Sequence, residues 1–308
     1  MRVLVTGGAG FVGSNLVARL LREWDCTVTV LDDLFTGEPG HLAGLDVELV
    51  QGSVADEPLL RRVIEGQDVV FHLAARNIIA SAANPIEDLN VNTRGTFHVL
   101  SLCRELGIER LVYTSTSSVY GNSRTLPVHE ETLPLFLNFY SVSKFAGEAY
   151  AQTFAVAHKL PVNVVRYSNV YGPNQSISNP YCGVVGKFIA AALAGDDIVI
   201  HGDGEQTRDF TYVDDACDAT MRAALHTGAD VFNIATGVET SVNHLAELVI
   251  ELTGSSSRIR YTSNRDIDNI RRRVLSIDRA GVKLGYFPSV SLRDGLARTI
   301  DWYRSTRG

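Results

Sequence analysis

A tyrosine and a lysine stand four positions apart in the run Tyr140-Ser141-Val142-Ser143-Lys144. In a helix this spacing places both side chains on one face. A free tyrosine has a pKa of about 10, and a nearby ammonium group stabilises the phenolate and lowers that pKa. The pair therefore predicts a tyrosine that takes a proton from a hydroxyl group near neutral pH. Because this spacing is also common by chance, an exposed pair on an amphipathic helix is the alternative.

Three glycines mark a second candidate site. Gly7, Gly10 and Gly13 follow an expected strand and precede a helical pattern. Glycine permits a tight turn there and a close approach of the backbone to a pyrophosphate, which the N–H groups of the helix N-terminus can bind. The spacing predicts a dinucleotide site, and a glycine-rich turn without a ligand is the alternative.

The acid Asp32 indicates which dinucleotide to expect. It follows a second expected strand, about 20 residues after the glycines, where an acid suits the ribose hydroxyls of NAD. A carboxylate there would repel the additional phosphate of NADP, and no arginine stands beside it in the sequence. We therefore predict NAD in preference to NADP.

Short apolar runs position these residues. They do not alternate with polar residues, as expected for parallel strands covered on both faces. Helical patterns between them predict an α/β fold with a Rossmann doubly wound parallel sheet. The expected strands are 2–6, 27–31, 47–51, 69–73, 111–115 and 162–167. Later we expect a loop at 172–182, a strand at 198–201 and helices at 184–194, 213–226, 242–252 and 292–303.

The regular alternation of strands and helices ends after the expected strand at 162–167, and this divides the chain into two expected domains. Residues 1–170 would form a NAD-binding Rossmann domain, to which the chain returns near 208–235. Residues 171–308 would form mainly a smaller C-terminal substrate-binding α/β domain, over the sheet edge where open α/β sheets bind ligands.

Bulk composition excludes several classes of protein. The 308 residues carry a formal net charge of −7, which argues against non-specific nucleic-acid binding. No apolar run reaches the roughly 18 residues of a membrane span, and no signal peptide is visible. The four cysteines are scattered and match neither a disulfide framework nor a metal motif. We expect a cytoplasmic protein without a metal, a membrane anchor or a nucleic-acid partner.

Ordered motifs along almost the whole chain resemble the extended short-chain dehydrogenase/reductase family. The resemblance is closest to its NAD-dependent nucleotide-sugar epimerases and dehydratases, the UDP-sugar 4-epimerases in particular. The motifs are VTGGAGFVG at 5–13, FHLAA at 71–75, YTSTSSVYG at 113–121, YSVSK at 140–144, RYSNVYGP at 166–173 and GDGEQTRDF at 202–210.

The resemblance implies a catalytic set of Thr116, Tyr140 and Lys144. Tyr140 would take the proton of a sugar hydroxyl, and Lys144 would lower its pKa and hold the nicotinamide ribose. Thr116 would hydrogen-bond the reacting oxygen. Hydride from the sugar carbon would pass to NAD, leaving a keto sugar that the same site can reduce again.

The resemblance also implies binding residues. Substrate contacts would come from Thr116, Ser117, Asn169 and Arg208, with Arg265 a weaker candidate because the run 271–273 competes for its role or is a solvated basic face. The ligand would be a nucleotide-diphosphate sugar, most typically a UDP-sugar, and the enzyme a homodimer joined through helices of the Rossmann domain. The implied cofactor contacts are Gly7, Gly10, Phe11, Val12, Gly13, Asp32, Ser53, Val54, Leu73, Ala74, Ala75, Tyr140, Lys144 and Tyr167.

Two departures from the family pattern matter. Dehydratases and many decarboxylases of the family carry an acid just after the position of Thr116, whereas this chain has Ser117 and Ser118. This favours a 4-epimerase over a dehydratase or decarboxylase. Ser53 stands where relatives often bind the adenine amino group with an acid.

The residues leave room for two rival functions and for several sugars. A net dehydrogenase or reductase would use the same groups, and an inactive NAD-binding regulator would use the same fold. For the sugar, residues 174–182 contain no arginine, which disfavours a uronate, but serines beside Thr116 could bind a carboxylate. Glucose, N-acetylhexosamine, uronic acid and deoxysugar substrates therefore all stay open.

Three side chains are expected to serve the fold rather than the chemistry. His72 lies in an apolar strand and is predicted to pack in the core. Asp214 and Asp215 precede a helical pattern and are predicted to cap it.

Overall fold

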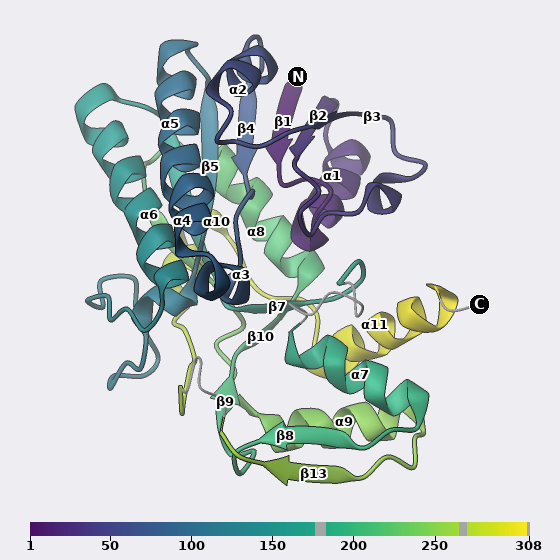
Figure 1. Cartoon of the computed structure of the whole chain (residues 1–308). Helices are drawn as coiled ribbons and strands as arrows, with labels where there is room; N and C mark the ends of the chain where they lie inside the picture. The colour runs from purple at the N-terminus through teal and green to yellow at the C-terminus, as the bar shows by residue number, and fades with distance from the viewer. Residues whose placement is uncertain (176–182, 265–269, 307–308) are drawn as a thin grey trace.

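A seven-stranded parallel sheet forms the centre of the molecule. The computed structural model describes residues 1–175, 183–264 and 270–306. The strand order is β11-β6-β5-β4-β1-β2-β3, so the order reverses at β1 and β4 as in a doubly wound fold (Figure 1). The strands are β1 (Arg2–Thr6), β2 (Thr27–Asp32), β3 (Val47–Gln51), β4 (Val69–His72), β5 (Arg110–Thr116), β6 (Val162–Tyr167) and β11 (Val231–Ile234).

Helices cover both faces of this sheet. Successive side chains of β1 point to opposite faces, and accordingly Val3 and Val5 lie in one apolar core and Leu4 in another. Strands buried on both faces read as continuous apolar runs, which is why they could be predicted. One face carries α1 (Phe11–Glu23) and α8 (Val213–Leu225), and the other carries α2 (Glu57–Ile64), α5 (Thr96–Glu105) and α6 (Phe139–His158).

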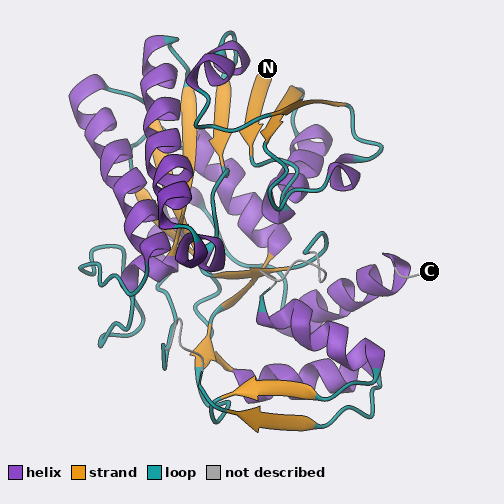
Figure 2. Cartoon of the chain, in the orientation of Figure 1, coloured by secondary structure: helices purple, strands orange, loops and turns teal. Residues whose placement is uncertain are grey.

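A smaller α/β lobe lies at the carboxyl ends of the strands, at the bottom of Figure 2. Its two longest strands, β8 (Ile198–His201) and β13 (Ile259–Thr262), pair in parallel. Two short pairs lead into it: β7 (Asn169–Tyr171) with β10 (Phe210–Tyr212), and β9 (Thr207–Arg208) with β12 (Thr240–Ser241). Its helices are α7 (Val184–Ala194), α9 (Val242–Thr253) and α11 (Leu292–Thr306).

The remaining elements are short. Between β4 and α5 lie α3 (Ile78–Ala83), α4 (Pro85–Asp88) and a π-helix, η2 (Leu89–Gly95). Two 3-10 turns, η1 (Pro39–Leu42) and η3 (Ser117–Tyr120), follow β2 and β5, and α10 (Asp278–Leu284) packs on β11 and α8. None of the described helices is long and apolar enough to cross a bilayer.

The predicted α/β fold with a doubly wound sheet is confirmed. All six predicted strands of the first half are present, and the predicted helix at 184–194 and strand at 198–201 match α7 and β8. The two-residue strands, α3, α4, α10 and β11 were not predicted. Of the expected loop at 172–182, only residues 172–175 belong to the described chain, and they form neither helix nor strand.

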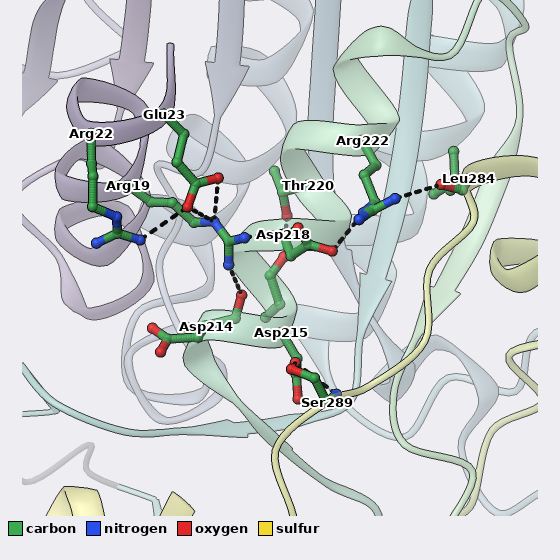
Figure 3. Close-up of polar contacts among 11 residues, drawn as sticks. Arg19, Arg22, Glu23, Asp214, Asp215, Asp218, Thr220, Arg222, Leu284 and Ser289 are labelled. Carbon is green, nitrogen blue, oxygen red and sulfur yellow. Dashed lines mark hydrogen bonds and ion pairs between the residues drawn. The ribbon is translucent and has the colours of Figure 1, made fainter.

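The prediction that Asp214 and Asp215 cap α8 is wrong. Tyr212 is the N-cap residue, and it makes no side-chain capping bond. The Asp215 carboxylate instead accepts hydrogen bonds from the backbone N–H (3.0 Å) and hydroxyl (2.8 Å) of Ser289, a contact visible in Figure 3. Both acids lie in the first helical turn, where the helix dipole still favours negative charge. Asp215 therefore fastens the C-terminal segment to α8.

Ion pairs join α1 to α8 across one face of the sheet (Figure 3). Arg19 donates to the Asp214 carbonyl and to the Asp218 carboxylate, both at 2.8 Å. Asp218 also accepts from Arg222 at 2.6 Å, and Arg222 reaches the Leu284 carbonyl at the end of α10. Residues nearly 200 positions apart thus form one layer.

Candidate active site

The loop between β1 and α1 admits only glycine at key positions. Gly7 has φ of +73°, and a Cβ there would lie 2.7 Å from the backbone nitrogen of Ala74. A Cβ on Gly13 would lie 2.1 Å from the carbonyl oxygen of Gly7. Helix α1 begins at Phe11 without a side-chain cap, so its first N–H groups face the loop. This arrangement fits a pyrophosphate.

The Asp32 carboxylate lies beside this loop at the end of β2. It accepts hydrogen bonds from the N–H groups of Ala9 and Leu34, both at 2.9 Å. Burial raises the pKa of Asp32 above its ordinary value, and those two N–H groups oppose the rise. The acid is thus oriented before any ligand arrives.

A cavity of about 220 Å³ opens over the glycine loop, and we call it the first cavity. The structure brings every residue that was implied as a cofactor contact into its wall. These are Gly7, Gly10, Phe11, Val12, Gly13, Asp32, Ser53, Val54, Leu73, Ala74, Ala75, Tyr140, Lys144 and Tyr167. The glycine cradle, the exposed helix N-terminus and the acid together fit a dinucleotide.

Helix α6 presents Tyr140, Lys144 and Glu148 on one face. Asn138 caps this helix by accepting the N–H of Ser141 at 2.9 Å. Lys144 is 2% exposed, and its Nζ lies 4.3 Å from the ring centroid of Tyr113. Burial lowers the pKa of Lys144 to about 7, although Glu148 and Asp88 oppose the shift.

The pKa of Tyr140 differs from the sequence-based expectation. Burial raises the pKa of Tyr140 to about 12, while a hydrogen bond with Thr116 opposes the rise. The expected lowering by Lys144 is not found, and burial disfavours the charged form of Lys144 as well.

Two buried acids fix α6 in place. Asp88 accepts from Ser143 at 2.9 Å and from Asn92 of the π-helix at 2.6 Å. Glu148 is fully buried and pairs with Arg166 of β6 at 2.6 Å. Sequence reasoning missed both acids, although the Glu148 position, four residues after Lys144, extends the same helix face.

Thr116 and Ser117 end β5 and begin η3. The Thr116 hydroxyl accepts the N–H of Ser118 at 3.1 Å and lies within hydrogen-bonding reach of Tyr140. Ser117 is buried. Neither Thr116 nor Ser117 is among the described residues that line the first cavity or the second cavity described below. Their neighbour Ser115 lines the first cavity and donates a hydrogen bond to Glu148.

A second cavity of about 700 Å³ lies between the sheet and the smaller lobe. Asn169 and Arg208 both line it. The Oδ1 atom of Asn169 is buried without a partner in the described chain. Arg208 donates to the carbonyls of Thr207 and Ile270, each at 2.8 Å. The structure therefore brings the two predicted substrate residues into one cavity.

The second basic candidate is only partly visible. Arg265 lies outside the described residues. The run 271–273 matches the alternative of a solvated basic face in part: Arg271 and Arg272 are exposed and pair with Asp203 and Glu239, each at 2.7 Å, whereas Arg273 is buried. Arg271 also lines the second cavity.

The prediction that His72 packs in the core is confirmed. It is 1% exposed and contacts the hydroxyls of Thr6 (2.7 Å) and Thr96 (2.9 Å). Burial lowers the pKa of His72 to about 3, so the ring stays neutral. Sequence reasoning missed Arg76, which lines the first cavity and pairs with Asp33 at 2.6 Å.

Known proteins share this architecture and these motifs. Residues 3–235 match the NAD dependent epimerase/dehydratase family. The chain belongs to this family. The prediction of NAD as the cofactor is thereby confirmed at the level of the family.

Individual family members match over almost their entire length. The UDP-glucose 4-epimerase of Mycolicibacterium smegmatis is 36% identical over 313 residues, covering 99% of both chains. The UDP-N-acetyl-alpha-D-glucosaminuronate decarboxylase of Bacillus cytotoxicus is 34% identical over 318 residues, covering 98% of both chains. The crystal structure of the Thermotoga maritima UDP-glucose 4-epimerase with UDP-glucose superposes with a TM-score of 0.96 at 35% identity, covering 100% of both chains.

Proposed function

We propose that this chain is a NAD-dependent nucleotide-sugar 4-epimerase that acts on a UDP-sugar by transient oxidation at the sugar C4. The observation that carries the proposal is that residues close together in the chain line the two cavities. Tyr140 and Lys144 line the first cavity, Asn169 and Arg208 line the second, and Tyr167 and Asn169 on consecutive strands lie one in each. A sugar whose diphosphate is held by Asn169 and Arg208 would have to extend from the second cavity toward Tyr140 in the first.

The proposed chemistry uses few protein groups. NAD, when bound, supplies the acceptor and later the donor of a hydride. Tyr140 takes the proton of the sugar 4-hydroxyl as the C4–H bond is broken, and it returns that proton to the keto oxygen when hydride reaches the opposite face. Lys144 lies on the same helix face, and in its protonated form it would supply the positive charge that a phenolate needs. Thr116 hydrogen-bonds Tyr140 and orients its oxygen.

Residues beside Thr116 favour epimerisation over the rival reactions. A serine cannot serve as the second acid that elimination of water requires, and Ser117 and Ser118 occupy that stretch. A dehydratase or decarboxylase is the second candidate, since a decarboxylase relative is nearly as similar as the epimerase relatives.

Residues 1–170 together with 208–235 are proposed as the NAD-binding domain, and the rest of 171–308 as the substrate domain. The assignment of residues 208–235 to the NAD-binding domain is supported by β11, which joins the central sheet, and by α8, which joins its helical layer. Asn169 and Arg208, on β7 and β9, would then hold the diphosphate where the two domains meet.

A homodimer through α5 and α6 is part of the proposal. The solvent face of α6 carries Phe139, Val142 and Tyr150, which are 40–57% exposed. Phe97 on α5 is 40% exposed, and its ring packs edge-on against Tyr150. Apolar side chains at this spacing on two adjacent helices fit a second copy of the same face.

A cytoplasmic location is also proposed. It is supported by the free thiols of Cys26, Cys103 and Cys217, since reducing compartments keep cysteines in this form.

The test is incubation of the purified protein with UDP-, dTDP-, GDP- and CDP-sugars without added cofactor, with products identified by NMR. A 4-epimer of a UDP-sugar supports the proposal. A 4-keto-6-deoxy sugar or a pentose would contradict it.

Tyr140→Phe is the matched variant. It removes only the phenolic oxygen, so we predict that turnover falls by at least about 100-fold while NAD binding persists. The measurement is the initial rate of epimer formation at saturating UDP-sugar, with bound NAD quantified in the same preparation. Full turnover by this variant would overturn the assigned role of Tyr140.

A further inference from the structure

Arg76 occupies an unusual place for a charged residue. It lies a few residues after β4, and the residue is almost entirely buried at 8% exposure. The backbone is held by Asn92, which accepts the Arg76 N–H at 2.7 Å and donates to the Arg76 carbonyl at 3.0 Å. The direction of the arginine side chain is therefore set by the buried π-helix.

The guanidinium reaches across to other segments. Its Nη2 donates to Asp33 at 2.6 Å and to Glu87 of α4 at 2.8 Å. It also lies 4.2 Å above the ring centroid of Phe35, a cation–π distance. Charge-assisted bonds at such short distances are stronger than bonds between neutral groups, and here the guanidinium is buried while its two carboxylate partners stay partly exposed.

Topology gives this link its position. Strands β4 and β2 flank β1, whose end begins the glycine loop. A bond from the segment after β4 to the segment after β2 therefore passes over that loop. Arg76, Asp33 and Thr36 all line the first cavity. Within the described chain, the buried Nε of Arg76 has no partner.

The segment after β2 also closes on Asp32. A Cβ placed on Gly37 would lie 2.7 Å from the Asp32 carboxylate, so residues 33–37 fold back over the acid that suits the NAD ribose. Asp33 and Phe35, the two partners of Arg76 in this segment, lie within that fold-back.

We propose that Arg76 is a positioning residue that retains the cofactor: it fastens segment 33–37 over the adenosine end of the first cavity, so that NAD leaves slowly. The inference rests on the NAD site of the proposed function. It deepens that function because an epimerase regenerates NAD in every turnover and gains nothing from exchanging it.

The experiment measures release of NAD rather than catalysis. Protein loaded with radiolabelled NAD is mixed with a large excess of unlabelled NAD, and the label that stays bound is followed over time. We expect Arg76→Gln and Asp33→Asn each to release NAD about tenfold faster or more than the parent protein. The double variant should release it no faster than Arg76→Gln, because both changes break one contact. Arg76→Lys, which keeps the charge, should restore part of the retention.

A matched control uses another arginine–carboxylate pair. Arg61 of α2 binds Glu105 of α5 through two hydrogen bonds at 2.7 and 2.8 Å on the surface, so Arg61→Gln should release NAD at the parent rate. Thermal unfolding of each cofactor-free variant separates a loss of retention from a loss of folding. Asp33→Asn and Arg76→Lys keep the test decisive if Arg76→Gln does not fold.

The outcomes distinguish this inference from the proposed function. Parent-like release by Asp33→Asn and by the folded Arg76 variants would overturn the retention role and leave the epimerase intact. If the variants release NAD fast but the parent protein forms no 4-epimer, the result would support the retention role of Arg76 and contradict the proposed function. A parent protein that binds no NAD would contradict both.

Discussion

At the scale of single residues, burial rather than sequence spacing determines how the active-site groups titrate. Tyr140 and Lys144 stand four residues apart, as a catalytic pair requires, yet burial raises the pKa of the tyrosine to about 12 and lowers that of the lysine to about 7. The packing around the two side chains thus disfavours the charged form of each. This could not be predicted from the sequence, because desolvation depends on the packing of β5, α6 and the π-helix.

The buried Lys144 has a predictable cost for stability. Its pKa is about 7 when folded, against an ordinary value of 10.5. Below pH 7 both states hold the proton, and the folded state bears the full cost of burying the charge. Between pH 7 and 10.5 the unfolded chain binds more protons, so stability rises with pH. We predict that Lys144→Met raises the free energy of unfolding at pH 6 by about 2 kcal/mol, a gain that shrinks as the pH approaches 10.

Chemical unfolding of the cofactor-free protein at about pH 6, 8 and 10 measures this gain. Lys187→Met, at an exposed position of α7, should change stability little at any of the three values. A gain from Lys144→Met that did not vary with pH would contradict the assigned titration.

At the scale of elements, the segments with local signals could be predicted and those defined by distant partners could not. Helix α7 matched its prediction because an apolar run is bounded by Gly183 and by Gly195, which caps it in a left-handed conformation. Arg76 was missed because its partner Asp33 is 43 residues away. The strands of the pairs β9–β12 and β7–β10 have only two or three residues each, too few to show a hydrophobic pattern that would identify a strand in the sequence.

The turn between β1 and α1 yields a prediction at this scale. A Cβ on Gly13 would meet the Gly7 carbonyl at 2.1 Å, and backbone cannot yield as a flexible side chain does. We predict that Gly13→Ala lowers the free energy of unfolding by about 1–3 kcal/mol and weakens NAD binding strongly. Calorimetric titration with NAD and chemical unfolding are the measurements.

Gly40 is the control for that substitution. It lies in η1, and a Cβ there would have no neighbour within 4 Å. Gly40→Ala should leave NAD binding unchanged. Equal NAD binding by Gly13→Ala and the parent protein would refute the close approach on which the glycine loop depends.

At the scale of the whole molecule, the fold class and the cofactor could be predicted because the motifs follow one another in a fixed order along the chain. The second cavity could be anticipated only through Asn169 and Arg208, since its other walls come from α3, α7 and β8, which are far apart in sequence. Arg265 lies outside the described residues, and within the run 271–273 Arg271 and Arg272 pair with Asp203 and Glu239, acids that are distant from them in sequence.

The proposed dimer gives a prediction at this scale. Tyr150→Glu places a charge in the middle of the apolar face of α5 and α6, where it would be buried against a second copy. We predict that the variant is a monomer by light scattering coupled to size-exclusion chromatography. Val282→Glu changes an 87% exposed valine on α10 and should leave the assembly unaltered. A parent protein that is itself monomeric would contradict the proposed interface.

The layer formed by α1 and α8 has a consequence for how the chain folds. Helix α1 is made first, but the helix that packs beside it on the sheet is completed only at Leu225, and the edge strand β11 only at Ile234. A nascent chain that has emerged through residue 170 would leave uncovered the side of α1 that packs on α8 and the edge of β6 that later pairs with β11. Such contacts between distant residues slow folding and expose intermediates to aggregation. The sheet and the helical layer of the N-terminal half are therefore completed only when the segment 208–235 has joined them.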